Sequence, residues 1–473
     1  MRASACLPAA FFMSLILSLA AICCAGDAPA EKTDGEKKPN ILLIVIDTMR
    51  RDHVGCYGYK RDTTPHLDEL AKAGVRCDQM IATASWTIPS LMSIFTSLPP
   101  SLHNATSSQN KVVPGLTTLA QELKKLGYQT AGVVSNPSAG AAFGFNKGFD
   151  FYDDYTVMLS GDLNLFNEHP TPQSFRTIRT SATVNRVALN WLEKIRKPDQ
   201  PFFLFLLYVD PHADYIPPAP YDTMFDPGYK GTARGNMYDD PKRQFSAEDK
   251  EHIKALYDGE IRYTDEHVGK ILKTFDDLGL AKETIVVATA DHGEELWDHG
   301  GIVHGHSLYD ELIRVPFIIR WPGILPAGRI IPNQVSNISI MPTLLDMLAA
   351  KIPPECQGPS LFGILSAKST LAPQLVFSET EVEAKHLRSV RSSEGKLIFD
   401  RKENGYHFFD LTADPYEQTE VLQPTAEWSR ALRTRYDDWS KLIAKGKKDF
   451  EDQQKAVLDE HLIQQLKDMG YSQ

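Results

Sequence analysis

Cysteine is scarce in this chain of 473 residues, and three of its six cysteines fall within the first 24 residues. The other three are Cys56, Cys77 and Cys356, and their spacing matches no zinc-binding motif. An odd number of thiols excludes a framework in which all are paired with one another. We therefore interpret them as core residues rather than as metal ligands.

An excess of positive charge is also missing. The chain has 50 Lys and Arg against 61 Asp and Glu, which gives a formal net charge of −11. This balance argues against nucleic acid as a partner and against polyanion binding over the whole surface. It leaves room for a small positive pocket built around a metal. The chain contains no internal repeat and no low-complexity tract, so a fibrous or disordered protein is not expected.

Long apolar runs are missing except at the N-terminus, where residues 7–24 follow Arg2 and end in small residues. This pattern predicts a signal peptide over residues 1–25 and an exported protein, periplasmic or extracellular. A membrane anchor is the alternative, but the run is short for a span; a lipoprotein site fits its cysteines poorly. Residues 26–38 are polar and predict a linker. No later stretch could span a bilayer, so we expect no integral span in the mature chain.

Apolar strands alternate with amphipathic helices over residues 39–350. This alternation predicts an α/β catalytic domain whose sheet is mostly parallel and covered by helices on both faces. The expected strands are 40–46, 129–135, 201–209, 284–290 and 315–320, and the expected helices are 67–73, 89–98, 116–126, 183–195 and 247–278.

The pattern changes after about residue 350, and we predict a separate C-terminal subdomain over residues 351–473. Short alternating segments there predict a small antiparallel sheet, followed by two amphipathic helices. The expected strands are 374–377, 388–391, 396–400 and 407–410, and the expected helices are 427–442 and 451–469.

Polar residues follow the expected strands at the point where each strand ends. They are Asp47, Asn136, the segment 210–212 and the pair Asp291-His292. In parallel α/β sheets, functional groups gather beyond the carboxyl ends of the strands. We therefore expect these side chains to converge at one edge of the sheet.

Asp47, Asp291 and His292 form the expected metal site. A buried carboxylate is costly unless it is paired or binds a cation. Two such carboxylates beside a histidine suit a hard or borderline divalent metal. The alternative is that each aspartate only caps a following helix.

Thr87 is the expected nucleophile and a further metal ligand. A hydroxyl is a weak nucleophile at neutral pH, and metal coordination lowers its pKa and aims its oxygen at sulfur or phosphorus. The alternative is that Thr87 caps the helix that begins near Pro89. Both roles are compatible, because a nucleophile at a helix N-terminus gains from the dipole and the free N–H groups.

Three histidines complete the candidate site: His212, His304 and His306. Histidines in loops at strand ends can bind a tetrahedral oxyanion or protonate a leaving group. We predict all three to be catalytic, and His212 and Asn136 to bind substrate.

Several motifs in order resemble the sulfatase family of the alkaline phosphatase superfamily, over residues 39 to 471. They are residues 39–52, 55–59, 64–68, 86–90, 127–131, 257–261, 290–294, 314–316, 341–346 and 466–471. The resemblance implies a large mixed, mostly parallel sheet between helices, with a small C-terminal α+β subdomain. It also implies one divalent metal, usually calcium.

The resemblance assigns roles residue by residue. Asp47, Asp291 and His292 match ligand positions and Thr87 matches the nucleophile. His212 matches a position that contacts the substrate oxyanion. His304 and His306 lie near the place where the family has a Lys or His beside the leaving group.

The chain also departs from the family. The family nucleophile is a Cys or Ser that is converted to formylglycine, a route not expected for Thr87; the Arg four residues on is Leu91. A second metal aspartate is replaced by Thr48, and the family's Gly-Lys-Trp-His segment by residues 133–136. His292 stands where Asn is common, which makes manganese or zinc more suitable than in a typical sulfatase.

These observations predict a secreted, metal-dependent hydrolase of sulfate or phosphate esters, in which metal-bound Thr87 attacks a small-molecule or glycan anionic ester. A Thr nucleophile with an Asp-His pair is closer to the phosphotransfer branches of the superfamily. One alternative is an envelope transferase of phospho-substituents, against which the lack of several membrane spans counts. Another is a catalytically silent metal-binding protein.

Overall fold

The computed structural model describes residues 37–106, 115–154, 180–237, 244–382 and 385–446, together with residues 460, 463, 464 and 466. The predicted signal peptide and nearly all of the predicted linker lie outside these residues, as does most of the predicted helix 451–469. Residues 38–473 form one compact unit. The predicted boundary near residue 350 stays a prediction.

The core of the fold is an eight-stranded sheet in the order β10-β2-β9-β6-β1-β5-β3-β4. β1 pairs in parallel with β5 and β6, whereas β9 runs antiparallel to both β6 and β2. The strands are β1 (Asn40–Ile46), β2 (Val75–Ile81), β3 (Gln129–Val134), β4 (Phe151–Asp153), β5 (Phe202–Tyr208), β6 (Thr284–Thr289), β9 (Arg314–Arg320) and β10 (Arg329–Ser336). The predicted mixed, mostly parallel sheet is confirmed.

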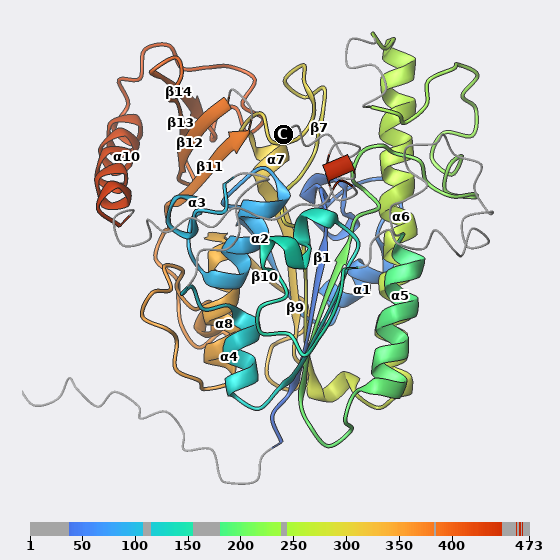
Figure 1. Cartoon of the computed structure of the whole chain (residues 1–473). Helices are drawn as coiled ribbons and strands as arrows, with labels where there is room; N and C mark the ends of the chain where they lie inside the picture. The colour runs from blue at the N-terminus through green and yellow to red at the C-terminus, as the bar shows by residue number, and fades with distance from the viewer. Residues whose placement is uncertain are drawn as a thin grey trace, which may run out of the picture. The chain divides into compact units, whose positions relative to one another are not determined.

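Helices cover both faces of this sheet (Figure 1). The central strands β1 and β5 are apolar and fully buried because each of their faces meets a helical layer. One layer contains α2 (Thr87–Thr96), α4 (Leu119–Lys125) and α8 (Ile340–Met347). The other contains α1 (Pro65–Lys72), α5 (Ser181–Asn190) and the long α6 (Ala247–Asp277).

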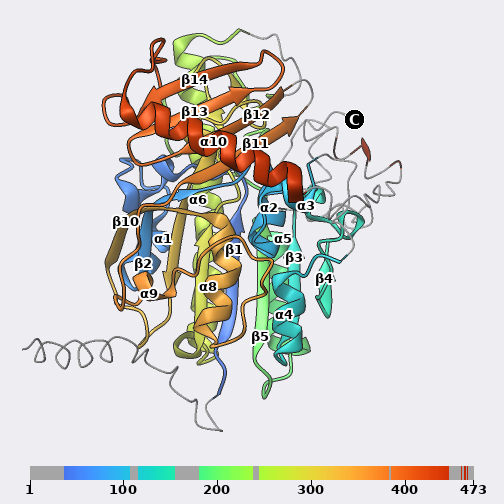
Figure 2. The ribbon, with the colours of Figure 1, turned by 90° about the vertical axis from the view of Figure 1, so that its left-hand side faces the viewer.

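A second, four-stranded antiparallel sheet forms the C-terminal part, as predicted, and α10 packs across it (Figure 2). Val390, Leu397 and Phe408 from this sheet share a core with Leu432 and Tyr436 of the helix. The elements are β11 (Val376–Val382), β12 (Lys385–Arg391), β13 (Gly395–Asp400), β14 (Gly405–Asp410) and α10 (Glu427–Gly446). The shorter elements are the hairpin β7 (Glu295–Leu296) and β8 (Ile302–Val303), and the single-turn helices α3 (Pro100–His103), α7 (Asp310–Ile313) and α9 (Phe362–Leu365).

Three strands of the large sheet were not expected from the sequence, β2, β4 and β10, and neither was the short hairpin of β7 and β8. β2 carries the charged residues Arg76 and Asp78, and the edge strand β10 contains Pro332, which weakens the strand pattern. Several predicted helix boundaries differ from the structure by one to five residues. α2 begins at Thr87 rather than Pro89, and α5 ends at Asn190 before a π-helical turn, Trp191–Ile195.

Hydrophobic helices of membrane-spanning length do not occur within the described residues.

Candidate active site and metal centre

The polar residues predicted at strand ends do meet at one edge of the large sheet. Asp47 follows β1, Asn136 follows β3, and Asp291 and His292 follow β6. Thr87 is the first residue of α2, so its side chain stands at a helix N-terminus. These five side chains have an exposed fraction of 0%.

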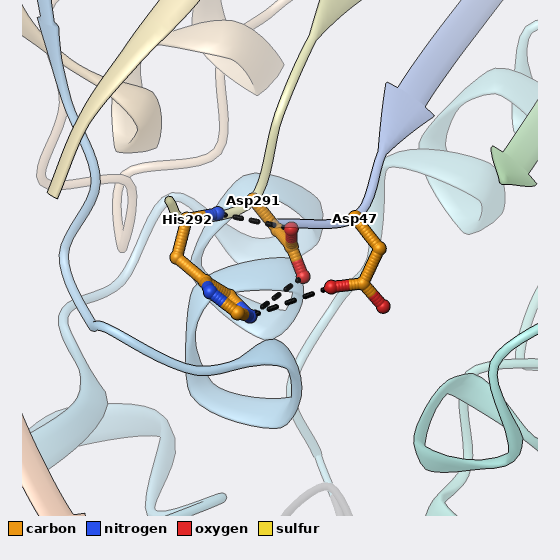
Figure 3. A group of neighbouring side chains, drawn as sticks. All are labelled: Asp47, Asp291 and His292. Carbon is orange, nitrogen blue, oxygen red and sulfur yellow. Dashed lines mark hydrogen bonds and ion pairs between the residues drawn. The ribbon is translucent and has the colours of Figure 1, made fainter. Parts of the chain in front are cut away.

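Three hydrogen-bond acceptors converge at the centre of this group (Figure 3). Nδ1 of His292 donates to the carbonyl of Gly293 at 2.9 Å, so Nε2 of the neutral ring carries a lone pair. This Nε2 lies 3.5 Å from Oδ1 of Asp47 and 3.5 Å from Oδ2 of Asp291. Neither carboxylate oxygen has a hydrogen-bond donor among the described residues.

Burial and mutual repulsion make this arrangement unfavourable without a cation. Burial, followed by repulsion from Asp291, raises the pKa of Asp47 well above its ordinary value. Burial raises the pKa of Asp291 to about 7. A divalent cation would supply the positive charge that two carboxylates and one imidazole lack. The donor set of Asp47, Asp291 and His292 therefore fits a metal ion, and their ligand atoms lie within 4.8 Å of one another.

Thr87 lies against this acceptor cluster. Its Oγ1 is 3.3 Å from Nε2 of His292 and accepts a hydrogen bond of 3.4 Å from Nδ2 of Asn136. The same Asn136 amide also donates to Asp47, so it ties the hydroxyl to a candidate metal ligand. Ser90 holds α2 in place, because its Oγ donates to the backbone carbonyl of Asp291 at 2.5 Å.

Two of the predicted histidines, His212 and His304, lie beside the cluster with their rings in edge or tilted contact. The ring of His304 lies 4.5 Å from that of His292 and 4.8 Å from that of His212. Burial lowers the pKa of His212 to about 3 and that of His304 well below its ordinary value, so both rings are neutral at pH 7. Nδ1 of His212 contacts the carbonyl of Ala213 at 2.6 Å, which places its proton on that nitrogen.

His306 stands further out than the other histidines. Its Nε2 lies 2.6 Å from Oε2 of Glu295, and this pairing raises its pKa against the opposing effect of burial. The exposed fraction of the side chain is 4% for His304 and 34% for His306. Solvent therefore reaches the site from the side of His306.

Glu294 lies inside the site, although no role was predicted for it from the sequence. Its Oε1 lies 2.8 Å from Nδ1 of His304, and burial raises its pKa to about 7. It was missed although its position, three residues after Asp291, gave a usable signal. Tyr257 of α6 could not be recognised as a site residue from the sequence. Its hydroxyl donates to the carbonyl of Thr48 at 2.8 Å and supports the loop after β1.

Leu91, which replaces the family's arginine, has an exposed fraction of 0% and packs in the main hydrophobic core. Among the described residues, no Lys or Arg side chain bonds to the carboxylates of Asp47, Asp291 or Glu294. The cluster has no permanent side-chain cation of its own, which strengthens the need for a metal.

Comparison with protein family models shows to which family this chain belongs. The sulfatase family model matches residues 39–350, and a model for the C-terminal part of N-sulphoglucosamine sulphohydrolase matches residues 299–438. The chain belongs to the sulfatase family. It is accordingly a sulfatase-like ester hydrolase with a candidate metal site.

Relatives of this sulfatase-family chain span most of its length. An arylsulfatase of Clostridium perfringens is 25% identical, and the alignment covers 86% of this chain and 94% of the relative. An ulvan-active sulfatase of Formosa agariphila is 27% identical and covers 87% of this chain and 82% of its own.

Solved structures share the fold. The phosphonate monoester hydrolase of Silicibacter pomeroyi has a TM-score of 0.71 at 21% identity, over 86% of this chain and 96% of that one. A protein solved with its substrate D-glucosamine-2-N,6-O-disulfate has a TM-score of 0.69 at 21% identity, over 86% and 99%.

Proposed function

We propose that this sulfatase-family hydrolase is an exported, metal-dependent enzyme that cleaves sulfate or phosphate esters through Thr87. The observation that supports this most directly is the position of the Thr87 hydroxyl. It lies at the N-terminus of α2, against Nε2 of His292, in a cluster where Oδ1 of Asp47 and Oδ2 of Asp291 have no hydrogen-bond donor among the described residues. A hydroxyl with only a capping role would not need three convergent acceptors beside it.

Asp47, Asp291, His292 and Thr87 would hold the metal. The bound ion would supply positive charge that favours the alkoxide form of Thr87 and the charge that develops on the ester oxygens. Calcium is the ion that the family resemblance implies. The nitrogen ligand of His292 makes manganese or zinc suitable as well.

The reaction would proceed in two displacements. Oγ1 of Thr87 gives up its proton and attacks sulfur or phosphorus, and the bond to the leaving-group oxygen breaks as that oxygen takes up a proton. A covalent ester of Thr87 results. Water then attacks the same sulfur or phosphorus and loses a proton, the bond to Oγ1 breaks, and Thr87 regains its hydroxyl as sulfate or phosphate departs.

The histidines would move these protons. A carboxylate accepts hydrogen bonds, so Nδ1 of His304 donates to Glu294 and Nε2 becomes the nitrogen that exchanges a proton. His306, on the solvent side, would meet the leaving group, and His212 and Asn136 would contact the transferred oxyanion. Asn136 already donates to the nucleophilic oxygen.

The substrate would be a small-molecule or glycan ester that carries an anionic group. The relatives include an ulvan-active sulfatase and a protein that binds a disulfated glucosamine. The solved phosphonate monoester hydrolases have the same fold, so both sulfur and phosphorus esters need to be tested.

The deciding experiment compares aryl sulfate, aryl phosphate and aryl phosphodiester turnover after chelation and return of calcium, manganese or zinc. We expect one substrate class to be hydrolysed only with metal. Thr87→Ala should lower kcat at least roughly a thousandfold without loss of metal. Thr96→Ala is the matched control, because that buried hydroxyl of α2 bonds only to backbone groups, the carbonyl of Met92 and the N–H of Leu98, among the described residues.

Full activity of Thr87→Ala would contradict covalent catalysis. Metal-bound protein that turns over none of the three esters would favour a silent binding protein or an unusual substrate class.

A further inference from the structure

A second charged region lies away from Thr87, in a cleft of about 820 Å³. The cleft is bordered by residues 50–52 after β1, the turn 57–61 and residues 415–418. None of its lining residues belongs to the acceptor cluster or to the candidate histidines. Residues 50–52 and 57–59 belong to the sequence motifs 39–52 and 55–59, and the proposed reaction gives these particular residues no role.

The carboxylates of this cleft are already paired. Arg50 contacts Asp52 at 2.7 Å and Asp298 at 2.6 Å. Asp310 contacts two buried cations of the C-terminal sheet, at 2.7 and 2.8 Å. Glu311 is paired with His299 at 2.8 Å. Each acidic side chain of the lining therefore contacts a cation other than Arg51 and Arg314.

Arg51 and Arg314 remain as cations without a matching carboxylate. Arg51 approaches Asp78 only at 3.9 Å, and Asp78 is shared with Arg76 at 3.2 Å. Arg314 donates only to the backbone carbonyl of Asp78, at 3.2 Å. The Nε atoms of Arg51 and Arg314 are buried and have no hydrogen-bond acceptor among the described residues.

The two guanidinium groups are held in place and repel each other. Arg51 lies over the ring of Tyr57, 4.5 Å from its centroid, which fixes the plane of the side chain. Burial, followed by the charge of Arg51, lowers the pKa of Arg314 to about 10. An anion in the cleft beside the two arginines would offset this repulsion and accept hydrogen bonds from their guanidinium groups.

We infer that this cleft binds a sulfate or phosphate group through the guanidinium groups of Arg51 and Arg314. Planar arginines present paired donors that match a tetrahedral oxyanion. Lys60 also lines the cleft and adds positive charge at its exposed rim. The site does not depend on the proposed reaction, because it involves neither Thr87 nor the candidate metal ligands.

The test measures binding of inorganic sulfate to the full-length, metal-loaded protein by calorimetry at low ionic strength. The double variant Arg51→Gln/Arg314→Gln should bind this sulfate at least roughly tenfold more weakly than the wild-type protein. Arg433→Gln on α10, an exposed arginine outside the cleft, is the matched control and should bind normally. Equal sulfate affinity of the wild-type protein and the double variant, or no binding to either, would overturn the inference.

The double variant Arg51→Lys/Arg314→Lys keeps the positive charge of both side chains. It shows whether the Gln double variant loses sulfate binding through loss of charge or through misfolding. It should retain part of the affinity that the Gln variant loses, and a loss as complete as that of the Gln variant would count against a charge-based site. Turnover of a small aryl ester by the metal-loaded protein should be the same in the Gln double variant and the wild type. Sulfate binding needs no turnover, so this inference can fail or hold whatever becomes of the proposed reaction.

Two sources of the anion can be separated with glucosamine that carries one or two sulfates. If the anion is a second group of the substrate, the KM for the disulfated sugar rises in the double variant and the KM for the monosulfated sugar does not. If the anion is free in solution, both KM values stay constant while the loss of sulfate binding persists.

Discussion

Two buried groups of charged side chains lie in this molecule, and they are built in opposite ways. The acceptor cluster of Asp47, Asp291 and His292 contains two carboxylates and no cation. The second group, here called the ion network, joins the large domain to the C-terminal sheet. It contains Asp310, Arg391, Lys396 and Glu417, with ion pairs of 2.7 to 2.8 Å.

Asp310 and Asp291 show the difference, although burial also raises the pKa of Glu417 in the ion network to about 7. In the ion network, Arg391 and Lys396 lower the pKa of Asp310 against the effect of burial. In the acceptor cluster, burial raises the pKa of Asp291 to about 7. Charges that are matched within the chain support the fold, whereas charges that the chain leaves unmatched indicate a ligand.

The largest expected effect comes from breaking the matched group. Asp310→Asn leaves Arg391 and Lys396 buried with too little negative charge, and we expect the free energy of unfolding to fall by about 3 to 5 kcal/mol. Urea denaturation measures this loss, and metal content should stay unchanged. Asp437→Asn, which breaks an exposed pair with Arg433, is the control and should cost less than about 1 kcal/mol. Equal effects of the two substitutions would remove the distinction between a matched buried group and a surface pair.

The same substitution in the acceptor cluster should have the opposite sign. The pKa of Asp291 in the metal-free protein is about 7, above the ordinary value of about 4 for an unfolded chain. The folded protein therefore binds more protons than the unfolded chain between these values, and Asp291 destabilises it increasingly as pH rises through this window. Metal-free Asp291→Asn should exceed the wild type in stability by up to about 4 kcal/mol above pH 7, and by nothing near pH 4.

Urea denaturation across this pH range measures the difference between the two metal-free proteins. Carboxylates outside the acceptor cluster that have raised pKa values, such as Glu417, titrate in both proteins and cancel, whereas Asp47 loses the repulsion of Asp291 and adds to the difference. Metal should stabilise the wild type and leave Asp291→Asn nearly unaffected. If metal-free Asp291→Asn is less stable than the metal-free wild type at pH 8, the charge of Asp291 does not destabilise the metal-free fold.

The acceptor cluster could be predicted from the sequence, whereas the ion network could not. Continuous apolar runs made β1 and β5 recognisable, and the polar residues directly after the strands placed the acceptor cluster. β10 was missed because Pro332 interrupts an edge strand. The ion network and the arginines of the cleft could not be predicted, because Arg51, Arg76 and Arg314 come from three distant segments that only the folded sheet brings together. Glu294 was within reach, since acidic residues that follow a buried strand are unusual.

The smallest effect concerns two histidine–glutamate pairs, one in each region. Glu294 lies 2.8 Å from His304 in the site, and Glu311 lies 2.8 Å from His299 beside the ion network. We expect Glu294→Gln to lower kcat about tenfold with little change in KM, because His304 loses the carboxylate that fixes its tautomer. Glu311→Gln should leave kcat unchanged. If Glu294 acts only through His304, then Glu294→Gln should cost nothing further in a His304→Gln background, and additive losses in the double variant would instead give Glu294 a role of its own.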